Sequence, residues 1–118
     1  MALDFEEMRA RQQALQARYA GWWEPVDPEH GRNKILWMLA ELGEAIQLVK
    51  RNPTEAFMQE GSVRHDFVEE LADVLMYFND VLLCYGITVD ELRDVYLKKH
   101  ERNMKRWKTG DDDAYERK

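Results

Sequence analysis

The stretch LAELGEAI, residues 39–46, lies in a strongly apolar segment and carries two carboxylates three residues apart, Glu41 and Glu44. On a helix, the apolar residues of this segment form one stripe, which predicts an ordinary core face. That stripe contains Ile35, Leu39, Leu42, Ile46 and Val49. The two acids share a second stripe with Trp37 and Leu48. A purely solvated helix face rarely has this composition, so the pair is a candidate site.

The segment DFVEELADVLMYFNDVLLCY, residues 66–85, repeats the arrangement with Glu70 and Asp73. A hairpin of two helices can bring both acidic pairs face to face. Crowded carboxylates repel and raise each other's proton affinity unless cations lie among them, and oxygen ligands suit Mg²⁺ or Mn²⁺. We therefore expect a bound Mg²⁺, with Mn²⁺ as the alternative ion. The predicted ligands are Glu41, Glu44, Glu70 and Asp73.

Composition predicts a single all-α domain over residues 1–110, followed by a flexible acidic tail over 111–118. The chain has 118 residues, 45% of them hydrophobic, with no alternating strand pattern. Its net charge of -6 argues against nucleic acid as a partner. We expect a cytoplasmic protein without a membrane partner, because no run reaches transmembrane length, the N-terminus lacks an apolar signal core, and Cys84 is the single cysteine.

Helix-end signals predict four long helices and one short turn. The expected N-caps are Asp4, Asn33 and Thr88, and the expected stops are Pro53 and Gly86. A loop or short helical turn is expected over residues 54–61. The long helices are expected to span about residues 5–19, 33–50, 65–85 and 88–107.

The segments AELGEAIQLVK and EELADVLMYFND resemble the all-α nucleoside triphosphate pyrophosphatase superfamily, which includes MazG-like proteins, dCTP pyrophosphatases and dimeric dUTPases. The signature of that superfamily is Glu-Glu-x-x-Glu followed, after a spacer, by Glu-x-x-Asp. Ala40 replaces its leading Glu, while the four metal-facing positions are intact. The resemblance implies a four-to-five-helix antiparallel bundle, Mg²⁺, and hydrolysis of a nucleoside triphosphate to monophosphate and pyrophosphate. Glu41 and Glu44 are the catalytic candidates.

The basic segment YLKKHERNMKRWKTG, residues 96–110, resembles the Lys-x-x-x-Asn-x-x-Arg element of dimeric dUTPases. Lys99, Asn103 and Arg106 carry that element here and share one helix face by their spacing. Such a stripe is suited to binding phosphate oxygens. Basic residues near a helix C-terminus also suit the helix dipole, which is an equal explanation for Lys105 and Lys108.

A base-binding site is expected near Gln12, an amide on an otherwise apolar stripe of the first helix. A buried amide requires a hydrogen-bonding partner. In dimeric dUTPases a Gln in a similar setting faces the uracil, which implies the same role here. Trp22, Trp23 and Trp37 are candidates to stack on the base, although Trp residues more often lie in a core, and Tyr96 completes the predicted base site.

The favoured substrate is dUTP, with a dCTP-preferring or broad-specificity MazG-like enzyme as the alternative. A hairpin with this little core of its own also predicts a homodimer or tetramer. A competing interpretation from another class is a non-enzymatic, metal-binding helical interaction module. A di-iron bundle is disfavoured, because neither acidic motif is followed by His at the required spacing.

Overall fold

The computed structural model describes residues 2–109, with side chains described through residue 106. The described part contains no β-strand, only an isolated bridge between Ala20 and Trp23. The predicted all-α class is therefore confirmed, while the predicted tail over 111–118 lies outside the described residues. The helices are α1 (Phe5–Arg18), the 3-10 turn η1 (Pro28–His30), α2 (Gly31–Arg51), α3 (Thr54–Phe57), α4 (Ser62–Cys84) and α5 (Val89–Thr109).

The chain divides into two compact units, Met1–Gly86 and Ile87–Lys118, and each is described by itself. The first unit contains helices α1 to α4, and the second contains α5. Within the described residues, no single helix is both long and apolar enough for a membrane span; α4 and α5 reach that threshold by length and composition only when counted as a bent pair. The single domain predicted over residues 1–110 stays a prediction.

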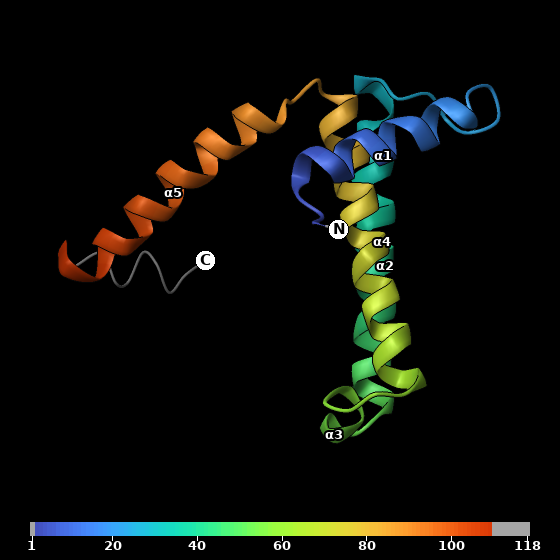
Figure 1. Ribbon diagram of the computed structural model, residues 1–118, viewed down its shortest axis with the longest axis vertical. Helices are drawn as coiled ribbons and strands as arrows, with labels where there is room; N and C mark the ends of the chain where they lie inside the picture. Colours follow the sequence, from blue (N-terminus) through green and yellow to red (C-terminus); the bar gives the residue numbers. More distant parts are fainter. Residues whose placement is uncertain (1, 110–118) are drawn as a thin grey trace. The chain divides into compact units, whose positions relative to one another are not determined.

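The first unit is built on a long hairpin, in which α2 and α4 run antiparallel and side by side (Figure 1). Helix α3 lies in the connection at one end, where Phe57 contacts Phe67 of α4 with ring centroids 5.0 Å apart. Helix α1 crosses the other end of the hairpin and packs on α4, with Phe5 edge-on to Phe78 at 6.1 Å. The end covered by α1 is where α2 begins and α4 ends.

Several predicted helix ends are confirmed by the hydrogen bonds that cap them. Asp4 caps α1 by accepting the backbone N–H of Glu7 at 2.9 Å. Thr88 caps α5 in the same way, accepting the N–H of Glu91 at 3.1 Å. Gly86 follows α4 with φ +65°, the left-handed conformation that glycine adopts at low cost.

The predicted N-cap at Asn33 is wrong, because helical structure starts earlier in the chain. The Asp27 side chain accepts the backbone N–H of His30 at 3.1 Å and caps η1, which leads directly into α2. Asn33 lies within the first turn of α2 and donates its amide to the Glu24 carboxylate at 2.9 Å. Gly31 is buried at the start of α2, where a Cβ would overlap the ring of Tyr85.

The apolar stripe predicted as a core face of α2 is not buried within the first unit. Leu39 and Ile46 are 55% and 54% exposed, and the other members of the stripe are exposed as well. The reason is that α2 directs its acid-bearing side toward α4, so the apolar stripe has no neighbour within the first unit. Among the described residues the fully buried apolar side chains are Ala45, Leu82 and Cys84.

Removing the cap of α1 should lower stability without changing the fold. We expect Asp4→Ala to reduce the free energy of unfolding by about 1 kcal/mol, because the Glu7 N–H loses its acceptor. Asp4→Asn keeps a side-chain acceptor and is the matched control, expected to stay close to wild type. Urea unfolding followed by circular dichroism measures both, and equal losses in the two variants would contradict the capping role.

Candidate functional site

Three carboxylates converge at the α2–α4 interface. Glu41 extends from α2, and Glu70 and Asp73 extend from successive turns of α4. Each offers one oxygen, and these oxygens lie within 4.8 Å of one another. All three side chains are half-buried. This spacing and donor chemistry can hold a hard divalent cation.

Glu70 interacts with every other member of the acidic cluster, which comprises Glu41, Glu44, Glu70 and Asp73. Its Oε2 atom is buried and has no hydrogen-bond partner. The pKa of Glu70 is raised above its ordinary value of 4.5, mainly because a protonated Glu70 can donate to Glu41, with desolvation adding to the shift. The pKa of the exposed Glu44 is raised as well, by its contact with Glu70. Both shifts arise because these carboxyl groups lie close together.

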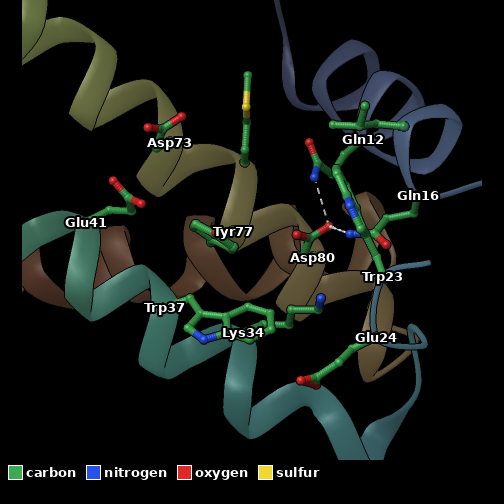
Figure 2. A pocket seen from close by; sticks show the side chains of 12 residues that line it. Gln12, Gln16, Trp23, Glu24, Lys34, Trp37, Glu41, Asp73, Tyr77 and Asp80 are labelled. Carbon is green, nitrogen blue, oxygen red and sulfur yellow. Dashed lines mark hydrogen bonds between the residues drawn. The ribbon is translucent and has the colours of Figure 1, made fainter. Parts of the chain in front are cut away.

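A pocket of about 430 Å³ adjoins the acidic cluster (Figure 2). Glu41 and Asp73 lie at one side of it, while Gln12, Gln16 and Trp23 lie at the other. All of its lining residues belong to the first unit. They are Gln12, Leu15, Gln16, Trp23, Glu24, Lys34, Trp37, Glu41, Asp73, Met76, Tyr77 and Asp80.

The wall of the pocket away from the acidic cluster contains buried polar groups. Asp80 is only 2% exposed, and its Oδ1 accepts the side-chain amides of Gln12 at 2.9 Å and Gln16 at 3.0 Å. Burial raises the pKa of Asp80, while these two hydrogen bonds and the charge of Lys34 oppose the shift. Lys34 is 2% exposed and places its Nζ 4.8 Å from the centre of the Trp37 ring. A charged group buried to this degree lowers the stability of the fold unless it has partners. Buried charged groups of this kind are typical of binding sites.

Most residues predicted from the acidic motifs and the first helix lie at this site. Gln12, Trp37, Glu41 and Asp73 line the pocket, and Glu70 completes the group of three carboxylates. Glu44 is exposed and adjoins the group through Glu70.

Of the two adjacent tryptophans predicted to stack on a base, the structure puts one in the pocket. Trp22 is 87% exposed and is absent from the lining of the pocket, whereas the adjacent Trp23 lines it. Trp23 stacks on Tyr19 with ring centroids 4.4 Å apart, and this stack orients its indole. Consecutive residues point in different directions, so the dipeptide alone could not distinguish them.

The predicted phosphate-binding residues and Tyr96 lie on α5, in the second unit. Tyr96 is 67% exposed and Lys99 is exposed, whereas Asn103 and Arg106 are partly buried. Their helical spacing puts Lys99, Asn103 and Arg106 on one face of α5. Their role in phosphate binding stays a prediction.

Sequence reasoning missed Lys34, Gln16 and the hydrogen-bonding role of Asp80. A signal was present for Lys34, which precedes Trp37 and Glu41 on the same stripe of α2. Gln16 follows Gln12 by one helical turn. No sequence pattern indicates that both amides meet Asp80, because 64 and 68 residues separate them from it.

A second group of candidate ligands, His65, Asp66 and Glu69, lies near the start of α4. All three are exposed, and His65 contacts Glu69 at 3.2 Å one turn away. Exposed charged pairs of this kind are common on helices, so the group supports no site.

Comparisons with known proteins provide no family for this chain: no family model, curated protein or solved structure matches it.

Replacing Glu70 should stabilise the cation-free protein near neutral pH. A raised carboxyl pKa in the folded state means that the folded protein binds protons more tightly than the unfolded chain. The free energy of unfolding therefore falls as pH rises from about 4.5 through the raised pKa of Glu70. Glu70→Gln removes this contribution, so its melting temperature in EDTA should exceed that of wild type at pH 7 and fall less between pH 4.5 and 7.

The exposed Glu60→Gln is the matched control and should follow the wild-type pH profile. Differential scanning calorimetry across the pH series measures all three proteins. A Glu70→Gln variant that melts below wild type throughout would contradict repulsion within the acidic cluster.

Proposed function

We propose that the protein is a Mg²⁺-dependent nucleoside triphosphate pyrophosphohydrolase that releases a nucleoside monophosphate and pyrophosphate. The observation that supports this function best is the continuity of the acidic cluster with a pocket of amide and aromatic groups. The two ends of a nucleotide match the two ends of this site, because an anionic phosphate chain lies at one end and a flat, hydrogen-bonding base at the other. No other arrangement in the described residues combines these two chemistries.

The residues present fit a divalent cation. Glu41, Glu70 and Asp73 offer converging oxygens, and the buried Oε2 of Glu70 lacks the partner that a buried polar atom requires. Glu44 is positioned beside them to complete the ligand set. When bound, Mg²⁺ would neutralise charge on the phosphates and lower the pKa of the water molecule that attacks the phosphate.

In this proposal the protein's own groups position the substrate and accept a proton. Glu41 and Asp73 belong both to the acidic cluster and to the pocket lining. Of the two, Glu41 is proposed to orient or deprotonate the attacking water, as the family resemblance implies. Trp23 and Trp37 provide flat apolar surfaces for the base.

The resemblance to dimeric dUTPases favours dUTP as the substrate, and a dCTP-preferring or broad MazG-like activity is the alternative. The buried amides of Gln12 and Gln16 support a base-reading pocket, since side-chain amides can bind a pyrimidine edge through both a donor and an acceptor.

We also propose that the protein assembles as a homodimer or tetramer. The apolar stripe of α2 is exposed, as are Val68 and Leu75 on α4. Three buried apolar residues make a small core for the part of the chain that the structure describes, and a second copy would bury these faces. The same surface on each subunit would then meet around a symmetry axis.

Turnover should depend on the acidic cluster. We expect Asp73→Asn and Glu44→Gln each to reduce pyrophosphate release by at least about a hundredfold with little change in helical content, because the site loses ligand charge. Asp66→Asn, an exposed carboxylate on the same helix, is the control and should retain activity.

The measurement is phosphorus NMR of products from dUTP, dCTP, dTTP, dATP and dGTP with Mg²⁺, then with EDTA. Full activity in both cluster variants would contradict the proposed site. Absence of turnover with every nucleotide, despite Mg²⁺ binding, would favour the helical interaction module.

Self-association should depend on the exposed stripe of α2. We expect Leu39→Glu to shift the protein to a smaller species in sedimentation velocity, because a charge at a buried interface is costly. Gln47→Glu, at an exposed polar position of the same helix, is the matched control. A wild-type protein that sediments as a monomer would contradict the assembly and would indicate that another part of the same chain covers the stripe.

A further inference from the structure

Asp80 makes two hydrogen bonds that fix the direction of both amides in the pocket wall. Its Oδ1 accepts Nε2 of Gln12 at 2.9 Å and Nε2 of Gln16 at 3.0 Å. All three side chains are at least 90% buried and line the pocket, and Figure 2 shows the amide nitrogens directed at the carboxylate. The two glutamines come from successive turns of α1 and the aspartate from α4.

An ionised carboxylate accepts hydrogen bonds and donates none, so each glutamine must direct its NH₂ group to Asp80. The amide oxygen is at the opposite corner of the planar group and is therefore directed away from Asp80. Burial raises the pKa of Asp80, whereas the two amide N–H groups and the positive charge of Lys34 act in the opposite direction and favour the ionised state. Neither glutamine can exchange its donor and acceptor positions while Asp80 carries its charge.

This restriction matters for a pocket that reads a base. Uracil presents a carbonyl beside a ring N–H, while cytosine presents an amino group beside a bare ring nitrogen. An amide free to turn over satisfies either edge, because reversing it exchanges donor for acceptor. An amide held in one direction satisfies one edge and leaves unpaired polar groups against the other, which is costly in a buried site.

We propose that Asp80 is a positioning residue that sets base specificity by holding the amides of Gln12 and Gln16 in one direction. This inference rests on the proposed nucleotide-binding function of the pocket. The ligand class is a pyrimidine nucleotide, and the selected edge is the one complementary to the fixed amides.

The test is Asp80→Asn, which changes shape little and replaces the acceptor-only group by an amide. In the wild type a single oxygen, Oδ1, accepts both glutamines. An Asn can present either its oxygen or its NH₂ group at that point, so turning the Asn over lets both glutamine amides turn over as well. Calorimetric titration with the uncleavable α,β-imido analogues of dUTP and dCTP, in Mg²⁺, measures the specificity ratio without hydrolysis. Asp66→Asn is the matched control.

We expect wild type and Asp66→Asn to bind one analogue about ten- to a hundredfold more tightly than the other. In Asp80→Asn that ratio should fall close to one, mainly through tighter binding of the disfavoured analogue. A merely structural role would weaken both analogues equally and leave the ratio unchanged. Equal binding of the two analogues by wild type, no binding of either, or an unchanged ratio in Asp80→Asn would overturn the inference.

If Asp80→Asn fails to fold, Gln12→Met serves in its place, because it keeps the side-chain length and removes one reading amide. The ratio should fall through loss of the favoured analogue, and an unchanged ratio would overturn the inference. Failure of the proposed function is separate: it appears as absence of pyrophosphate from natural triphosphates, whatever the analogues' binding ratio.

Discussion

The rest of the structure depends on the polar interface between α2 and α4. Two long antiparallel helices usually meet through apolar stripes, but here each directs carboxylates toward the other, and Lys34 and Asp80 are almost completely buried. Buried charges require partners. Asp80 has them in two amides and the charge of Lys34, whereas the acidic cluster keeps an unpartnered oxygen on Glu70. This contrast distinguishes an internally satisfied wall from the acidic cluster, which is the proposed cation site.

Helix α1 forms one wall of the pocket. It contributes two buried amides to a wall whose remaining polar groups come from α2 and α4. Without α1, Asp80 would be a solvent-accessible carboxylate at the end of a hairpin, with its charge screened by water. The same crossing therefore organises the base end of the proposed site and contributes to holding the first unit together.

Placing acids at the hairpin interface has a consequence for stability. The apolar stripe of α2 is displaced to the outside, where large side chains such as Leu39 and Ile46 remain about half exposed. Hydrophobic burial is the main favourable term in folding, so a chain arranged this way gains from covering that face. In the proposed function, the site and the assembly therefore have one cause, which is that α2 directs its acid-bearing face rather than its apolar face toward α4.

The sequence by itself determined the all-α class, most helix ends and the identity of the clustered acids, because capping and helical periodicity are local properties that short spacings encode. Only the tertiary structure decided that the acidic stripe of α2, rather than its apolar stripe, faces α4, and that Trp23 rather than Trp22 lines the pocket. It also brought Gln12 and Gln16 to Asp80. These outcomes depend on how the helices cross and on which side chains fill the interface between them. Local sequence spacing cannot indicate contacts between residues more than sixty positions apart.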